Sequence, residues 1–112
     1  MNEQQILDLL INANICNGNI SATVLPESTP LPYGRYSATD RPFAPDLVTS
    51  DVNQIRFNLS IWDKDYNTLY ALKNQIRNIF KTQGEEIFSN IGLEEQTGYQ
   101  RLETNWYFIE TI

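Results

Sequence analysis

Residues 52–80 read VNQIRFNLSIWDKDYNTLYALKNQIRNIF, and this stretch decides the fold. In its first eleven residues apolar and polar side chains alternate, most regularly from Ile55 to Ile61. Successive side chains of a strand point to opposite faces of the sheet. The alternation therefore predicts an antiparallel strand with one buried face.

A helix is expected directly after this strand. The segment Asp63-Lys64-Asp65 supplies short acidic side chains, which accept hydrogen bonds from free helix N–H groups and complement the helix dipole. We therefore expect the helix to begin near Tyr66 and to end near Lys81, with Gly84 beyond it as a stop signal. Its apolar residues recur at spacings of three and four, which places them on one face: Leu69, Leu72, Ile76, Ile79 and Phe80. Strand and helix should pack their apolar faces together.

Upstream of the alternating strand, all five prolines lie between Pro26 and Pro45. Proline fixes φ and lacks an N–H donor, so this region cannot be a central helix or a central strand throughout. Residues 33–39 contain no proline and predict a strand. The link over residues 40–51 is long for a hairpin, and long loops are often functional. Its apolar residues without a clear period are Phe43, Leu47 and Val48. They either contact a partner or fold back onto the core.

The N-terminal segment predicts a short helix over about residues 3–13. Asn2 is suited to be its N-cap, and Gln5 stands at the third helical position, as in a capping box. Residues 14–21 contain an Asn-Gly pair and predict a turn, and residues 22–25 predict a short strand.

The C-terminal residues 99–112 are rich in β-branched and aromatic side chains and predict a long strand. Apolar side chains fall on both of its faces, with Trp106 on one and Tyr107 on the other. This implies either a central position in the sheet or a face that another molecule covers. Residues 88–93 are ambiguous and predict a short strand or a turn.

Together these elements predict one α+β domain over residues 1–112. We expect a mostly antiparallel sheet of about four strands packed against two helices, with a long loop between the first two long strands. A length of 112 residues and a hydrophobic content of 41% suit one core, which buries roughly two-thirds of the unfolded surface. No targeting or membrane segment is expected, because Asp8 interrupts the apolar run near the N-terminus. We expect a soluble, intracellular product.

The composition disfavours enzymes. The chain contains no histidine, which removes His-based triads, imidazole bases and His-containing metal sites. The pairs Glu85-Glu86 and Glu94-Glu95 offer carboxylates for catalysis, but such pairs on exposed turns usually serve solubility. Residues 63–67 imitate the start of a calcium loop and then lack the required glycine and glutamate. The single Cys16 cannot form an internal disulfide. We expect no catalytic residues, cofactor or metal.

The formal charge of −6 disfavours nucleic-acid binding, which depends on cationic contacts to phosphates. Lys73, Arg77 and Lys81 are four residues apart, so they form a basic stripe along the second predicted helix. The stripe is either a solvated flank that complements the helix dipole or a surface for salt bridges. In a ring it could meet Glu94 and Glu95 of the neighbouring subunit.

In the order of its elements, the chain resembles the small tail-terminator and tail-completion proteins of long-tailed bacteriophages. The resemblance covers nearly the whole length. It lies in the N-terminal helix, the loop approaching Leu31-Pro32-Tyr33, the strand over residues 55–62, the helix over 66–80 and the long final strand.

The resemblance implies a virion structural protein without enzymatic activity. Relatives of this kind form a homo-oligomeric ring, often a hexamer, which caps the tail tube at its final length and offers a surface to the head connector or neck. The resemblance also implies a place at the tail–neck region of the virion, with host cytoplasm as the site of assembly. No membrane, cofactor or specific nucleic acid is expected as a partner.

For partner contacts we expect Phe43, Leu47 and Val48, since a loop that orders on binding is a common device. Trp62 falls on the polar register of its strand, which favours a contact role. Two alternatives stay open. One is a neck or head-completion protein, joining tail to head on a similar fold. The other is an unrelated small binding module that uses aromatic residues as a ligand platform: Tyr33, Tyr36, Trp106 and Tyr107.

Overall fold

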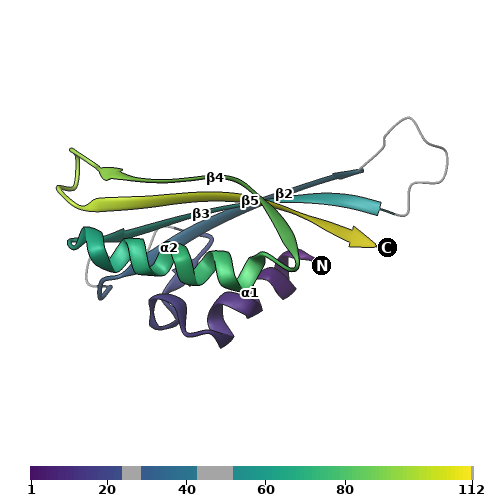
Figure 1. Cartoon of the computed structure of the whole chain (residues 1–112), viewed down its shortest axis with the longest axis horizontal. Helices are drawn as coiled ribbons and strands as arrows, with labels where there is room; N and C mark the ends of the chain where they lie inside the picture. The colour runs from purple at the N-terminus through teal and green to yellow at the C-terminus, as the bar shows by residue number, and fades with distance from the viewer. Residues whose placement is uncertain (24–28, 43–51, 112) are drawn as a thin grey trace.

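The computed structural model describes residues 1–23, 29–42 and 52–111 (Figure 1). Its elements in chain order are α1 (Glu3–Asn12), a 3-10 turn η1 (Ile15–Gly18), β1 (Ile20–Ser21), β2 (Tyr33–Pro42), β3 (Val52–Asp63), α2 (Tyr66–Phe80), β4 (Gly84–Leu93) and β5 (Gln100–Thr111). The strands form one sheet in the order β1-β2-β3-β5-β4, in which only β1 and β2 are parallel. The predicted α+β fold is confirmed.

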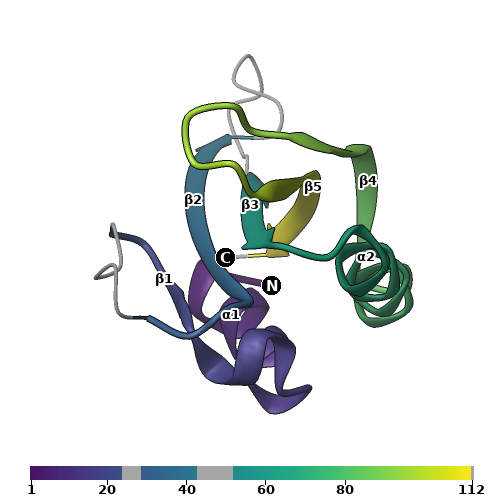
Figure 2. The same ribbon diagram turned by 90° about the vertical axis from the view of Figure 1, so that its left-hand side faces the viewer.

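Both helices lie on the same side of the sheet (Figures 1 and 2). Figure 2 shows α1 beneath β2 and α2 beneath β4, so each helix runs near one edge. Neither of the described helices lies on the opposite face of the sheet, and we call it the helix-free face. None of the described helices is long and apolar enough to cross a membrane.

The alternating strand behaves as its sequence predicts. The apolar side chains of β3 point to the helices and are buried: Ile55, Phe57, Leu59 and Ile61. In register with them, β5 contributes Leu102, Trp106 and Phe108 to the same core. β5 lies between β3 and β4, which confirms its predicted central position in the sheet. Ile109, which alternates with the core residue Phe108, is nevertheless 39% exposed.

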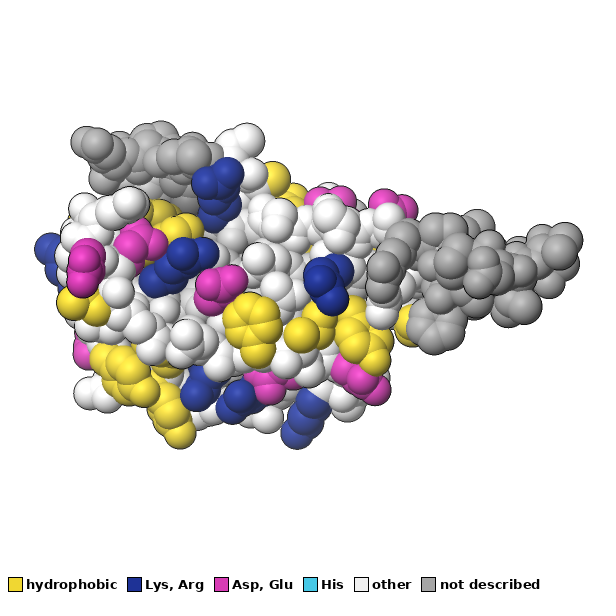
Figure 3. Space-filling view, turned by 90° about the horizontal axis from the view of Figure 1, so that it is seen from above, with side chains coloured by type: hydrophobic (Ala, Val, Ile, Leu, Met, Phe, Trp, Pro, Cys, Tyr) yellow, Lys and Arg dark blue, Asp and Glu magenta, His cyan; other side chains and the backbone are white. Residues whose placement is uncertain are grey.

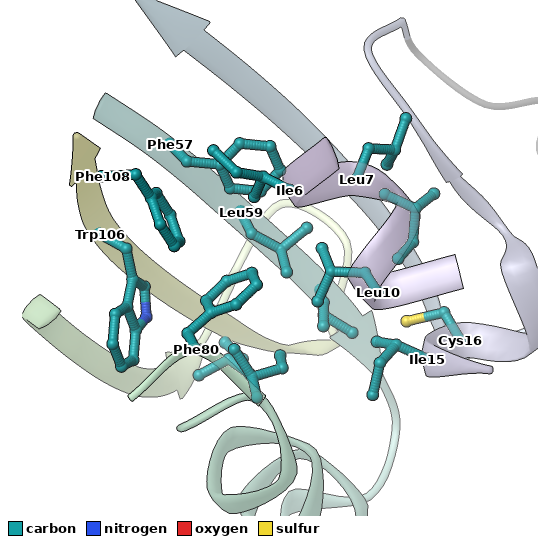
Figure 4. Packing of buried hydrophobic residues seen from close by; sticks show 14 of the residues in the cluster. Ile6, Leu7, Leu10, Ile15, Cys16, Phe57, Leu59, Phe80, Trp106 and Phe108 are labelled. Carbon is teal, nitrogen blue, oxygen red and sulfur yellow. The ribbon is translucent and has the colours of Figure 1, made fainter. Parts of the chain in front are cut away.

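Phe80 from α2 holds the centre of this core (Figure 4). Its ring packs edge-on against Phe57, Trp106 and Phe108, with centroid distances of 6.3, 5.4 and 5.0 Å. Such edge-to-face pairs are each worth about 0.5–1.5 kcal/mol beyond area burial. Trp106 is only 3% exposed and therefore belongs to the core.

Both helix starts follow the sequence signals. Asn2 and Gln5 form the predicted capping box, with hydrogen bonds of 2.8 Å in each direction. Asp65 caps α2 by accepting from the backbone N–H of Asn67 at 3.1 Å. Short side chains ahead of an apolar run thus fix where each helix begins.

Three local predictions need correction. Residues 88–93, predicted as a short strand or a turn, are the second half of the ten-residue β4, and Gly84 begins that strand. A register irregularity between Glu86 and Phe88 breaks the alternation that would have identified it. The first strand is Ile20–Ser21, earlier than the predicted 22–25, and residues 24 and 25 lie outside the described part.

Candidate interaction surfaces

The helix-free face is built from the side chains that alternate with the core residues. Register places Arg35 beside Ser60, Ser37 beside Asn58, and Asn58 beside Asn105. In space-filling view the middle of this face is mostly backbone and side chains that are neither charged nor hydrophobic, with charged and hydrophobic groups between them (Figure 3). This polar, uncovered sheet face is the first candidate surface.

An aromatic and charged cluster lies at one end of this face. Tyr33 and Trp62 stack with ring centroids 5.5 Å apart, and the guanidinium of Arg101 lies 5.5 Å from the Trp62 ring. Trp62 Nε1 donates to Glu94 at 3.1 Å. Figure 2 shows the connection between β4 and β5 crossing above β3 toward β2, which brings Glu94 to this position. Trp62 is half-buried, on the face where the sequence predicted a contact.

Arg101 links this cluster to the middle of the face. Its Nη2 donates to Ser60 Oγ at 3.0 Å, and Glu94 and Glu103 each lie 3.6 Å from its guanidinium. Beside it is a depression of about 300 Å³. Its lining comes from β2, β3 and β5: Arg35, Tyr36, Ser37, Asn58, Ser60, Trp62 and Arg101.

Three buried polar atoms on this face have no hydrogen-bond partner within the described residues: Asn58 Oδ1, Asn105 Oδ1 and Arg101 Nε. Leaving a buried donor or acceptor unpaired costs about 1–3 kcal/mol, so such atoms are rare in folded proteins. Asn58 and Asn105 are direct neighbours across β3 and β5. Each of the three atoms is already shielded from solvent by its own chain.

The flank of α2 beside β4 is the second candidate surface. Arg77 pairs within the chain with Glu86 of β4, Nε to Oε2 at 2.9 Å. Glu86 also accepts from Ser89, whose hydroxyl lies 2.6 Å from that of Thr104. Burial acts to raise the pKa of Glu86, but the hydrogen bonds from Arg77 and Ser89 and the nearby positive charges outweigh it and lower the pKa. This network fixes α2 to the sheet.

The other predicted charged residues are less engaged. Lys73 Nζ lies 4.4 Å from the centre of the Tyr70 ring, and Lys81 Nζ donates to Asn78 at 3.4 Å. Glu95 is exposed. The predicted contact of the basic stripe with Glu94 and Glu95 of a neighbour stays a prediction. Two residues of this predicted contact, Arg77 and Glu94, already have partners inside the chain. The remaining predicted contact residues, Phe43, Leu47 and Val48, lie outside the described part.

The four aromatic residues proposed as a ligand platform do not share one face. Tyr36 stacks on Phe57 and packs against the core, as Trp106 does, on the helix side. Tyr33 stacks on Trp62 on the helix-free face, and Tyr107 donates a hydrogen bond to Glu85. The prediction that these four residues form a single ligand platform is therefore wrong.

The acidic side chains and the single cysteine are the groups whose chemistry the described residues define. Within them, no group of three or more Asp, Glu, His or Cys side chains is arranged to hold a metal ion. Burial, with a smaller effect from the charge of Asp63, raises the pKa of Cys16 to about 12. A thiol with such a pKa stays protonated at neutral pH and is a poor nucleophile.

Comparison with known proteins does not assign this chain to a family. A scan against models of protein families finds no match, and a search of curated proteins finds none either.

Proposed function

We propose that this chain is a structural protein of a long-tailed bacteriophage particle. In this proposal copies of the chain form a ring, six-fold as in the proteins it resembles. The ring caps the tail tube, ends tube polymerisation and provides the surface that joins the tail to the head connector or neck.

The observation that supports the proposal best is the helix-free face. A broad polar sheet face presents the half-buried Trp62, whose ring stacks on Tyr33 and lies 5.5 Å from the guanidinium of Arg101. Aromatic and arginine side chains are enriched where proteins bind other proteins. A face of this kind fits a protein whose final state is inside an assembly.

The capping role follows from the physics of a polymer end. A growing tube presents a surface that accepts another tube subunit, and a terminator must bind that surface without presenting a new copy of it. A domain with one covered and one uncovered sheet face meets this requirement, because its two sides are chemically different. The tube protein and the connector or neck protein would then bind opposite sides of the ring.

A second candidate is a neck or head-completion protein on a similar fold. The same uncovered face would serve it, since joining tail to head also needs protein contacts on two sides. The two roles differ in what happens to the tube when the protein is missing.

The test is negative-stain microscopy of particles from a phage with a stop codon in this gene. Overgrown tubes of irregular length would support the capping role. Tubes of uniform length beside filled, unattached heads would replace it with the joining role. The control is the same phage supplied with the intact gene from a plasmid, which should restore normal particles. Normal particles without the protein would reject both roles.

A further inference from the structure

Among the described residues, both edges of the sheet lack a strand partner over most of their length. At one edge lies β4, which has ten residues and contains neither lysine nor proline. At the other edge β1 pairs only with Gly34 and Arg35, so the described β2 residues beyond Arg35 have no further strand beside them. Unpaired strand edges are templates for pairing with another chain, and lysine and proline are common protections against it.

Exposed apolar side chains gather at the β4 edge. Seven large apolar side chains of the described part are exposed, and five of these belong to α2 or β4. These five are Tyr66, Tyr70, Ile87, Phe88 and Leu93. Leu93 is the most exposed, at 62%. A concentration of exposed apolar groups at one edge indicates an interaction site.

The helices at the two edges carry opposite charges. Lys73 and Arg77 lie on α2, which has no acidic residue, and Lys81 follows it directly. Glu3 and Asp8 lie on α1, which has no basic residue, whereas the neighbouring β2 carries Asp40 together with Arg35 and Arg41. Figure 2 shows α2 under the β4 edge and α1 under the β2 edge.

The α1 edge also contains an acidic depression of about 190 Å³. Three carboxylate residues contribute to its lining: Glu3, Asp40 and Glu110. The Met1 ammonium is close by and donates to the carbonyl oxygen of Ile109 at 2.8 Å. No lysine or arginine is among the described lining residues, so the depression itself is acidic.

We propose that copies of this chain associate head to tail, with the α2–β4 edge of one copy against the α1–β2 edge of the next. Apolar side chains of β4 and α2 supply the affinity, and the opposite charges set the orientation. Because the two edges differ, the contact is heterologous and repeats around an axis until it closes. The inference deepens the proposed function, which supplies the expectation of a ring.

The test uses two charge-reversed variants of the purified full chain. The first is Lys73→Glu with Lys81→Glu, which leaves the internal Arg77–Glu86 pair intact. The second is Glu3→Lys with Asp8→Lys. Sedimentation equilibrium at low ionic strength gives the concentration of half-association. We expect each variant alone to raise that concentration about tenfold, because attractive exposed pairs become repulsive ones.

Mixing the variants provides the decisive measurement. In a 1:1 mixture every reversed edge meets an edge of opposite charge, so the wild-type half-association concentration should return. A misfolded variant could not produce this rescue, and circular dichroism with the neutral pair Lys73→Gln and Lys81→Gln checks folding separately. The matched control Arg56→Glu with Lys64→Glu changes the net charge by the same amount as the first variant, on the central strand β3 and directly after it, and it should associate like wild type.

Two results would overturn the inference: a mixture no better than its separate components, or a wild-type chain that stays monomeric at every concentration in low salt. The proposed function would be rejected by a different experiment, the one with the stop-codon phage. Normal tails from the stop-codon phage would reject the capping role and leave head-to-tail association standing. Overgrown tubes together with a monomeric chain would reject the contact and keep the role.

Discussion

Gly84 begins β4 directly against the ring of Phe108, and an alanine at this position has no room. A Cβ on residue 84 would lie 2.6 Å from two ring carbons of Phe108 and 2.7 Å from the carbonyl oxygen of Tyr107. The ring is fully buried and the oxygen belongs to the backbone, so neither can move cheaply. Overpacking of this kind costs about 1–3 kcal/mol. Alanine in place of a strand glycine otherwise stabilises the fold by roughly 0.5–1 kcal/mol, which offsets part of this cost. For Gly84→Ala we therefore expect a net loss of up to about 2.5 kcal/mol in unfolding free energy.

Gly92→Ala is the matched control, because it makes the same change in the same strand. No atom lies within 4 Å of the Cβ it would add, so we expect no loss and a gain of up to about 1 kcal/mol. Urea unfolding followed by tryptophan fluorescence measures both variants, with the m-value confirming that unfolding is unchanged in extent. Equal midpoints for the two variants would refute the tight approach of β4 to β5 at Gly84.

Three further predictions concern the network, the thiol and the helix-free face. The pKa of Glu86 is lowered in the folded state, so its stabilisation is present above the unfolded carboxyl pKa of about 4.3 and is lost as pH falls through the folded value. On acidification the wild type should lose about 0.5–1 kcal/mol more unfolding free energy than Glu86→Gln, and equal losses would contradict the Arg77 pairing. Cys16, with its pKa raised to about 12, should react with a thiol reagent only in denaturant, and rapid labelling of the native protein would show that it is accessible. Trp62→Ala should leave the domain folded and lower its incorporation into particles, whereas Trp62→Phe retains a ring to stack on Tyr33; normal incorporation of the alanine variant would exclude this end of the face as a contact.

Local patterns in the sequence were sufficient to predict most of the fold. The helices α1 and α2 and the strand β3 have regular periods and clear caps, so their positions could be read within a residue or two. The strand β4 lacks such a period, since its register changes between Glu86 and Phe88. The strand β1 is only two residues long, which is too short for any pattern.

The candidate interaction surfaces were harder to predict from the sequence than the fold. The position of Trp62 on the uncovered face followed from the alternation of β3. The unpaired atoms of Asn58 and Asn105 depend on the pairing of β3 with β5, which no local period reveals. The internal partner of Arg77 likewise comes from β4, across the turn after α2. The polar registers of β3 and β5, read together, were the signal that could have indicated this face.

The most direct test of the capping role adds the purified chain to an extract from cells infected with the stop-codon phage. Protein supplied before tube growth should yield tubes of uniform, wild-type length in negative stain, while protein supplied after growth should leave overgrown tubes unchanged. Tubes that stay overgrown and irregular when active, folded chain is present from the start would contradict the proposal that this protein ends tube growth.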